Sequence, residues 1–573
     1  MSDVKDIEYI IVGAYCVVML VVGGWGLFRY LQSRRPSALG QSLLAGVGTV
    51  HDLWRMEATN ARRACAVCAF DNAEAAAYCL LCGVATDVVS LEEVAPTTSA
   101  EHRLDWQREV LVGGQHRWRK HRTTQETNAR HFVARPTPGG NLVVESVAAF
   151  NARQPDGEAT VASLSFARKY QSFLEAVARL KAGHRYTFTS IRSARDATAL
   201  VQSTSSCLAK LSIADLHKPF SVRFEREPGI DAGGLEREWY SLVATALFNP
   251  HAGFFTATDA HCLELAATQD PVVRRCPKAL HDESSQWYRG IGRFVGRALY
   301  DGHPIPARFN VVLFKQLLGA PFGLDDLRFV DAAVFASLRW IDSHEDVAAL
   351  ALDFRYEPRP TSNAMGLGSV LEREADGTAH IVDLTPGGRD VVVTAENKAS
   401  FVAAYVQYRC AARVQAALAA FVAGVHDVLP LAILSVFDHE ELRLVLCGID
   451  IIDVDDWQAH TYLYGGPAAA RGEMTVAWFW AIVRSMEHAQ RAKLLQFVTG
   501  SYCVPFQGFR GLTNRDGVLC HFTLRVVSLA EAAYPVAHTC CNRLDLPRYK
   551  NKATLKRALT LVAAMDVTGF SMA

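Results

Sequence analysis

The chain has 573 residues, of which 50% are hydrophobic and 21% are charged. At roughly 150 residues per domain this length allows several domains with sizeable cores, and the composition excludes a wholly disordered or collagen-like chain. Lys plus Arg number 59 and Asp plus Glu number 59, a balance that argues against a protein built mainly to coat nucleic acid. The 14 cysteines are too few for a disulfide scaffold, so most should be reduced thiols.

The first segment, residues 1–36, is expected to be a membrane anchor. The run from Tyr9 to Phe28 contains no charged residue, and a helix of that length spans about 30 Å, the thickness of the hydrocarbon core. Acidic residues surround Lys5 before the run and arginines follow it, so a single-pass protein with its C-terminal domains in the cytosol is predicted. The alternative is a cleaved signal peptide, whose apolar run is about 7–15 residues long behind a basic segment.

Two Cys-x-x-Cys pairs within residues 60–85 predict a small zinc finger. The pairs are Cys65 with Cys68 and Cys79 with Cys82. Four thiolates complete a tetrahedral structural Zn²⁺ site, which holds a fold together and does no catalysis. The alternative is a pair of disulfides, which needs an oxidising lumen and contradicts the expected topology.

This cysteine spacing resembles the Ran-binding-protein type zinc finger. Asn72 stands where that family has it, whereas Arg63 replaces the family's usual Trp. Some members bind ubiquitin, and the matching positions here are Phe70 and Leu81, with Ala69 as a departure from the family pattern. Other members bind single-stranded RNA. The resemblance therefore leaves ubiquitin, RNA or neither as the ligand of the finger.

Residues 86–164 are expected to be a linker of uncertain structure. They mix Thr, Pro, Gly and charge, with turn signals at Pro136–Gly140 and Gln154–Glu158. A basic cluster, His116–Arg122, surrounds Trp118. It could touch anionic lipid or RNA, but a solvated helix face is the preferred interpretation, and we assign it no function.

Hydrophobic periodicity predicts the elements that follow. Ser163–Ala182 has apolar residues at helical spacing and should be an amphipathic helix. Phe220–Phe224 alternates like a strand, and a helical period resumes at Leu235 after glycine-rich turn signals. The sequence contains no GxxxxGK[ST], HExxH or GxSxG pattern, so phosphate loops, zincin proteases and serine hydrolases lose their usual support.

From about Ser165 to Ala573 the chain resembles a HECT ubiquitin-protein ligase domain. The matching stretches follow the family's order: FEREPGIDAGGLEREW at Phe224, IGRFVGRALYDG at Ile291, LTPGG at Leu384, ENKASFVAAY at Glu396, FDHEELRLVLCG at Phe437, FWAIV at Phe479, LLQFVTGS at Leu494 and AHTCCNRLDLPRY at Ala537. The resemblance implies an α+β, bilobed fold with a mainly helical N-lobe, placed at residues 165–464, and a smaller α/β C-lobe at 465–573. Gly465–Gly466 is the candidate hinge, with an ordinary surface loop as the alternative.

The resemblance places the nucleophile at Cys540, which follows His538 and Thr539. It implies that Cys540 accepts ubiquitin from a conjugating enzyme as a thioester and passes it to a substrate lysine, with no cofactor for catalysis. The family usually has Phe after the nucleophile, and this chain has Cys541. The aligned motif nevertheless favours Cys540 over Cys541.

Other site residues carry over from the same resemblance with two interpretations each. His538 biases the thiolate or shapes the loop, and Asp545 either orients the acceptor lysine or has a structural role in the turn. Phe570 stands fourth from the C-terminus, where many members carry a Phe important for ubiquitin transfer, and packing of the tail is the alternative. Residues that would dock the conjugating enzyme fall in Val334–Ile341, and they could equally be helix core: Ser337, Leu338 and Trp340.

Together these patterns predict a HECT-type ubiquitin-protein ligase at a membrane facing the cytosol. Its expected partners are ubiquitin, a conjugating enzyme, protein substrates and, through one transmembrane helix, the lipid bilayer, whereas a nucleic-acid partner is not expected. One alternative is a membrane-anchored ubiquitin- or RNA-binding scaffold with an inactive HECT domain. Another is a cysteine protease that uses Cys540 and His538, but two residues in one loop are poor geometry for a nucleophile–base pair.

Overall fold

The computed structural model describes residues 48–57, 61–74, 76, 78–86, 103–111, 114–120, 129–137, 141–155, 159–161, 164–184, 187–225, 227, 234–258, 262–266, 284–357, 381–449, 452–464, 474–514 and 518–564. Three predictions lie outside these residues: the anchor helix at 9–28, the hinge at Gly465–Gly466 and the role of Phe570. Within the described ranges, no helix combines the length and the apolar character needed to cross a bilayer.

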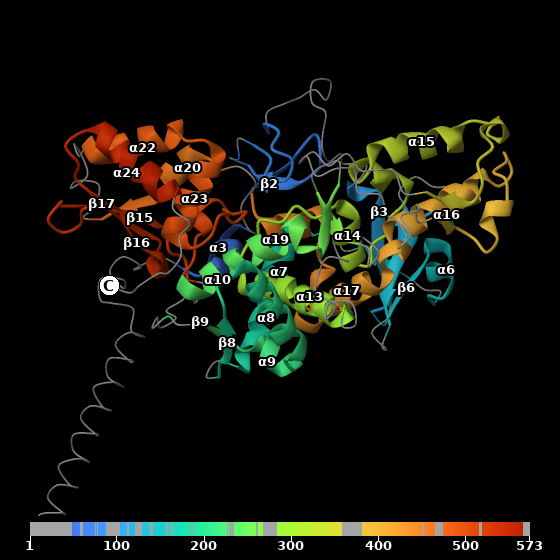
Figure 1. Ribbon diagram of the computed structural model, residues 1–573, viewed down its shortest axis with the longest axis horizontal. Helices are drawn as coiled ribbons and strands as arrows, with labels where there is room; N and C mark the ends of the chain where they lie inside the picture. Colours follow the sequence, from blue (N-terminus) through green and yellow to red (C-terminus); the bar gives the residue numbers. More distant parts are fainter. Residues whose placement is uncertain are drawn as a thin grey trace, which may run out of the picture.

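Most of the described chain forms a helical body, the N-lobe, which covers residues 164–449 (Figure 1). Its elements are α7 (Phe166–Ala182), β8 (Thr189–Ser193), α8 (Ala197–Lys210), α9 (Ile213–His217), β9 (Phe220–Phe224), α10 (Gly234–Leu247), η1 (Pro250–Ala252), β10 (Phe255–Ala257), β11 (Leu263–Leu265), α13 (Ser284–Asp301), α14 (Val311–Leu317), η2 (Leu324–Phe329), α15 (Ala332–Ser343), η3 (Ala348–Leu350), β12 (Arg355–Tyr356), β13 (Val382–Asp383), η4 (Gly388–Asp390), α16 (Lys398–Cys410), η5 (Ala412–Val414), α17 (Gln415–Val428), α18 (Leu431–Leu434) and α19 (His439–Cys447).

The helices α13 and α17 form the centre of the N-lobe, and glycines let them approach closely. A Cβ atom on Gly292 of α13 would lie 2.1 Å from the carbonyl oxygen of Phe421, and one on Gly424 of α17 would lie 2.2 Å from that of Arg289. Any side chain at either glycine would therefore force the two helices apart. The small N-lobe sheets each have two strands, such as the parallel pair β8–β9.

The elements predicted from periodicity in this region are confirmed. The expected amphipathic helix is α7, whose first turn is capped by the Ser165 hydroxyl, which accepts a hydrogen bond from the Arg168 amide. Its buried side chains recur at helical spacing and include Phe166, Tyr170 and Phe173. The expected strand is β9, with the bounds that alternation gives, and the helical period after it is α10.

The C-lobe begins near Ile452, earlier than the predicted residue 465. Its elements are α20 (Val454–Ala459), β14 (Thr461–Leu463), α22 (Met474–Ser485), α23 (His488–Thr499), η6 (Phe509–Gly511), β15 (Phe522–Val527), β16 (Val536–His538), η7 (Thr539–Cys541), β17 (Arg543–Pro547) and α24 (Lys552–Ala564). Ile452 and Trp457 belong to the separate hydrophobic core of this lobe. Strand β14 pairs in parallel with β15 in a four-stranded sheet of order β14–β15–β17–β16, so the boundary at 465 was wrong.

Two further folded units lie in the described part of the chain before residue 87. Helix α3 (Val50–Glu57) comes first. The four-cysteine segment predicted to bind zinc, residues 61–86 and called the zinc module for that prediction, follows with strands β1 (Arg62–Ala64) and β2 (Asp71–Ala73). Trp54 of α3 and Phe70 of the zinc module both belong to the N-lobe core. The HECT-like body therefore draws on residues well before 165, where the resemblance begins.

The region predicted as a linker contains a folded unit, the β-module of residues 103–161. Its elements are β3 (Trp106–Leu111), β4 (His116–Lys120), β5 (Phe132–Pro136), β6 (Leu142–Ser146), α6 (Val147–Ala152) and β7 (Ala159–Val161). The described part of the basic cluster, His116–Lys120, is strand β4, which pairs with β3, so the prediction of a helix face was wrong there. Trp118 is buried in a small core of this module, and Arg117 pairs with Glu109 of β3 at 2.5 Å.

Figure 1 shows the C-lobe at one end of the molecule and α15 with α16 at the other, beside the β-module. Helix α3 lies between the C-lobe and the N-lobe helices, and it touches both. Its Trp54 ring is 5.9 Å from Phe166 of α7 and 5.4 Å from Phe506 of the C-lobe segment, measured between centroids. At the C-terminal end of α3, Glu57 Oε1 forms an ion pair with Arg510 Nη1 at 2.8 Å.

Candidate active site

Cys540 lies on a tight turn at the edge of the C-lobe sheet. The turn is η7, which connects the antiparallel neighbours β16 and β17. Asn542 closes it with a φ of 50°, in the left-handed region that asparagine tolerates better than most residues. Among the cysteines that the structure describes, Cys540 is the exposed one, whereas Cys541 is half-buried. The thiol favoured by the sequence motif is thus the accessible one of the pair.

The surroundings of the Cys540 thiol favour its ionised form. Its pKa is lowered to about 6, first by a hydrogen bond with the Cys541 thiol, which outweighs the opposing effect of burial, and further by the charges of His538 and Arg237. The same contact raises the pKa of Cys541, whose thiol also donates to the His538 carbonyl oxygen at 3.5 Å. The lowered pKa favours the thiolate, which is the nucleophilic form.

Asp545 is buried beneath the turn on β17, with 6% of its surface exposed. Its carboxylate pairs with His538 Nε2 at 3.0 Å, Arg525 Nη1 at 3.1 Å and Arg543 Nε at 3.0 Å. Burial alone would raise its pKa, but the hydrogen bond from His538 and the two arginines hold that pKa below its usual range. Oδ2 takes the hydrogen bonds from His538 and Arg525, which fits a role in orienting the His538 ring. Oδ1 has the Arg543 ion pair and no hydrogen bond within the described residues, so the geometry also leaves room for the lysine-orienting role.

The residues predicted to dock a conjugating enzyme all lie on α15 but have different surroundings. Leu338 is buried in the N-lobe core, as the helix-core alternative expects. The Ser337 hydroxyl donates to the Ala333 carbonyl oxygen at 3.0 Å, within its own helix. Trp340 is 42% exposed and stacks on His344 with ring centroids 4.2 Å apart. Of the three, Trp340 offers a large apolar surface to a partner.

The four cysteines of the zinc module come together in space. Their sulfur atoms lie within 4.8 Å of one another, with Cys65 and Cys82 at 3.7 Å and Cys68 and Cys79 at 3.5 Å. In a tetrahedral site with Zn–S bonds of about 2.3 Å the sulfur atoms stand about 3.8 Å apart. The donor set and its spacing therefore fit a structural Zn²⁺ ion.

The backbone of each cysteine pair turns back on itself in the same way. The residue that follows each pair, Ala69 or Gly83, has a positive φ, 54° and 73° respectively. Between the two turns the buried Asn72 donates to the Phe70 carbonyl oxygen at 3.0 Å and accepts from the Leu80 amide at 2.9 Å. Asn72 therefore ties the two halves of the site together.

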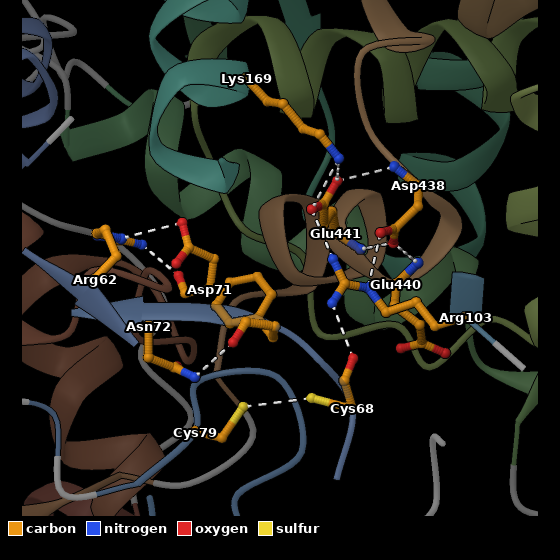
Figure 2. A network of polar contacts seen from close by, with 11 residues as sticks. Arg62, Cys68, Asp71, Asn72, Cys79, Arg103, Lys169, Asp438, Glu440 and Glu441 are labelled. Atoms are coloured by element: carbon orange, nitrogen blue, oxygen red, sulfur yellow. Dashed lines mark hydrogen bonds and ion pairs between the residues drawn. The ribbon is translucent and has the colours of Figure 1, made fainter. Parts of the chain in front are cut away.

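Figure 2 shows how the zinc module is fixed to the N-lobe. The Arg103 guanidinium donates to the Cys68 carbonyl oxygen at 3.1 Å and pairs with Asp438 at 2.7 Å and Glu441 at 2.8 Å, both at the start of α19. Lys169 of α7 reaches the same Glu441 at 2.8 Å. The Arg103 side chain is only 5% exposed, so these are desolvated pairs, whose loss costs more than that of surface pairs.

The two side chains predicted to bind ubiquitin are not presented by the zinc module in this structure. Phe70 is 0% exposed and packs on Phe166 of α7 with ring centroids 5.0 Å apart. Leu81 is 6% exposed in the same core. The contacts with the N-lobe occupy the surface that a ubiquitin molecule would need, because the module is part of the N-lobe core and not a free-standing finger.

Arg237 of α10 is a site residue that the sequence analysis missed. It lies in the stretch that begins at Phe224, yet no pattern shows which charged residue of that stretch reaches the turn. Its partner Asn542 lies 305 positions further along the chain. Only the three-dimensional arrangement of the two lobes brings them together.

Comparisons with known proteins agree with this geometry. A family profile described as HECT-domain (ubiquitin-transferase) matches residues 241–573, more than half of the chain. The chain is 32% identical over 397 residues to "E3 ubiquitin-protein ligase NEDD4" of Homo sapiens, covering 69% of this chain and 28% of that protein. It is 31% identical over 353 residues to "E3 ubiquitin-protein ligase TOM1-like" of Neurospora crassa, covering 61% of this chain and 8% of that protein.

The chain thus spans less than a third of the length of these curated relatives. The family match itself includes most of the N-lobe, from within α10 onward, and the whole described C-lobe, with the Cys540 turn inside it. The mixed helix-and-strand fold agrees with what the resemblance implied. The chain belongs to the HECT-domain (ubiquitin-transferase) family.

Proposed function

We propose that this chain is a ubiquitin-protein ligase that carries ubiquitin as a thioester on Cys540. The observation that carries the proposal is an exposed thiol with a pKa of about 6, on the turn that matches the family's active-site segment. Both relatives described above are named E3 ubiquitin-protein ligases, which supports the same activity here.

The chemistry takes two steps at one sulfur atom. The Cys540 thiolate attacks the carbonyl carbon that links ubiquitin to the conjugating enzyme, and the thiolate of that enzyme leaves, so one thioester replaces another. A substrate lysine, as the neutral amine, then attacks the new thioester. An isopeptide bond forms, Cys540 leaves as thiolate, and the amine proton passes to solvent or a nearby base. The first step needs access and a ready thiolate, both of which Cys540 has.

We further propose that the conjugating enzyme docks on α15 through Trp340. The exposed ring is held by its stack on His344, so little conformational freedom is lost when a partner covers it. Trp340→Ala should slow transfer of ubiquitin to Cys540 at limiting conjugating enzyme, and saturating enzyme should restore the rate. Ser337→Ala is the matched control on the same helix, since its hydroxyl is satisfied within α15.

We also propose that the chain binds one structural Zn²⁺ through Cys65, Cys68, Cys79 and Cys82, as in Ran-binding-protein type fingers, and that residues 9–28 anchor it in a membrane with the lobes in the cytosol. The sulfur spacing supports the zinc proposal. The uncharged run and the arginines after it support the anchor. Retention of the full chain in membranes after alkaline carbonate extraction tests the anchor, and its release would overturn that proposal.

A thioester assay on the full chain tests the ligase. The protein is mixed with a charged conjugating enzyme and resolved on gels with and without reductant, as wild type, Cys540→Ala and Cys541→Ala. A reductant-sensitive ubiquitin adduct that only Cys540→Ala abolishes is the expected result. Loss with Cys541→Ala alone would move the nucleophile by one residue. No adduct with any of several conjugating enzymes would favour a scaffold with an inactive HECT domain.

The full chain is the right material because the core does not begin at residue 165. Trp54 and Phe70 fill the N-lobe core beside Phe166, so a fragment from Ser165 onward would expose that surface.

A further inference from the structure

The turn that carries Cys540 is held by a residue from the other lobe. Arg237 projects from the first turns of α10 in the N-lobe and is 7% exposed. Its Nη1 atom donates to Asn542 Oδ1 at 2.9 Å and to the Thr539 carbonyl oxygen at 3.4 Å, which are the two ends of the Cys540 turn. The same guanidinium donates to the carbonyl oxygens of Thr499 at 3.4 Å and of Thr513.

These contacts bring the charge of Arg237 to one side of the turn without touching the nucleophile itself. Thr539 and Asn542 are both buried, whereas Cys540 between them is exposed. Asn542 also donates to the Cys520 carbonyl oxygen at 2.7 Å, so the turn is anchored on the C-lobe side as well. The guanidinium therefore restrains the backbone on both sides of the thiol and leaves the sulfur open to a partner.

A second contact on the same helix face does not involve the turn. One helical turn after Arg237, the Ser241 hydroxyl donates to the Gly500 carbonyl oxygen at 2.6 Å. Gly500 has a φ of +80° and comes close to α10, where an added Cβ would lie 3.1 Å from the Cβ of Arg237. This contact joins the same two lobes, so it provides a matched control for the effect of lobe contact alone.

We propose that Arg237 is a positioning residue that aligns the Cys540 turn for the discharge of ubiquitin to lysine, the step that follows thioester formation. The inference rests on the proposed function. In the structure the Cys540 turn lies against α10, at the opposite end of the N-lobe from α15 (Figure 1). A conjugating enzyme docked on α15 is far from this position, so the Arg237 contact belongs to an arrangement adopted after loading.

The test separates the two steps in the full chain. The protein is first loaded with ubiquitin from a charged conjugating enzyme, loading is then stopped, and the decay of the adduct is followed as free lysine is added. We expect Arg237→Ala to load within about twofold of wild type and to discharge at least about tenfold more slowly, the size of effect seen when reacting groups lose their alignment. Arg237→Lys should restore only part of the rate, since an ammonium cannot span the several acceptors that the guanidinium reaches.

Ser241→Ala is the control that removes a lobe contact away from the turn. We expect it to load and discharge within about twofold of wild type. If Ser241→Ala slows discharge as much as Arg237→Ala, general contact between the lobes explains the effect and the positioning role is wrong. Equal loss of loading and discharge in Arg237→Ala, or no loss in either, would also overturn the proposal.

A readout without ubiquitin keeps this inference separate from the proposed function. The rate at which iodoacetamide alkylates Cys540 is measured against pH by mass spectrometry of the peptide that contains it. Loss of the nearby guanidinium should move the midpoint of this profile upward in Arg237→Ala and leave it in place in Ser241→Ala. A wild-type chain that fails to form the adduct would contradict the proposed ligase activity, and an unmoved alkylation midpoint in Arg237→Ala would contradict the role of Arg237.

Discussion

At the scale of single residues, the unusual feature of this site is the second thiol beside the nucleophile. In place of the aromatic residue that the family pattern has at this position stands Cys541, whose thiol donates to the His538 carbonyl oxygen at 3.5 Å. The neighbouring Cys541 thiol is the leading cause of the lowered pKa of Cys540. Where the family has an aromatic side chain that packs, this chain has a thiol that lowers the pKa of Cys540. The reactivity of Cys540 therefore depends on residue 541.

The first prediction follows from that dependence. A thiol whose pKa is lowered to about 6 should gain reactivity as the pH rises through 6 and reach a plateau near neutral pH. Cys541→Ala removes the hydrogen bond, so the pKa of Cys540 should rise and the plateau should shift to higher pH. Cys541→Ser keeps an O–H donor and should retain most of the effect. The pH profile of iodoacetamide alkylation at Cys540 measures all three, and identical profiles for Ala and wild type would contradict the role of Cys541.

At the scale of elements, helix α3 packs against both the N-lobe helices and the C-lobe segment. Trp54 is 2% exposed, and its ring contacts Phe166, Tyr170 and Phe506, which also contact one another in the same core. A short bridge between Thr49 and Val518 adds a backbone contact to the C-lobe. A short helix with few side chains to bury gains most of its stability from such packing.

The second prediction concerns the packing of Trp54 in this contact. Trp54→Ala should reduce the free energy of unfolding by about 3–5 kcal/mol, because a large buried aromatic side chain leaves a cavity between two lobes. Urea denaturation followed by circular dichroism measures the change. Trp340→Ala, a substitution of the exposed tryptophan on α15, should change stability by less than about 0.5 kcal/mol. Equal effects of the two substitutions would show that α3 does not support the lobe interface.

The third prediction concerns the metal. Because Phe70 follows the first cysteine pair and packs on Phe166, which in turn contacts Trp54, loss of zinc should loosen the N-lobe core and not only the module. The purified chain should contain one equivalent of zinc, and a strong chelator should lower the thermal midpoint and change tryptophan fluorescence. Cys79→Ser should reproduce both changes.

Cys207→Ser is the matched control, since Cys207 is a half-buried cysteine on α8 and not part of the four-sulfur cluster. Its zinc content and thermal midpoint should stay close to those of wild type. A zinc-free chain with an unchanged midpoint would contradict the coupling between the module and the core.

The sequence predicted the elements whose signal is local. The helix α7 and the strand β9 follow from periodicity, and the cysteine pairs follow from spacing, because each is defined by neighbours in the chain. The boundary of the C-lobe was missed because β14 is three residues long and joins the sheet only through β15, whose partner residue Phe522 pairs with Thr461. The β-module was missed for a similar reason, since its strands are partly buried on both faces and show no clean alternation.

Within the site, the position of the candidate nucleophile was predictable from sequence, and the contacts around it were not. Cys540 is marked by the residues around it, whereas the burial of Phe70 and the reach of Arg237 depend on contacts between segments far apart in the chain. Resemblance carries over a motif because the motif is local. It does not show which surfaces an added module covers.

At the scale of the whole molecule, the described units before residue 162 pack against the lobes that follow them in the chain. The zinc module is fixed to α19 through Arg103, the β-module reaches α15 through Arg130, which pairs with Asp342 at 2.8 Å, and α3 contacts the C-lobe. These three units meet the N-lobe at different places along its length (Figure 1). The described units before residue 162 therefore contact the two lobes at several places, and their loss should affect stability and activity together.

The fourth prediction uses two truncations that differ by one helix. Removal of residues 1–47 takes away the expected anchor and leaves α3, whereas removal of residues 1–57 also takes away Trp54 and Glu57. Both should leave the membrane fraction if residues 9–28 anchor the chain. Only the longer truncation should lower the thermal midpoint and slow ubiquitin discharge from Cys540. It alone removes the Trp54–Phe506 contact and the Glu57–Arg510 ion pair. If both truncations behave alike in stability and discharge, α3 does not stabilise the two lobes, and the stabilising contacts begin at the zinc module.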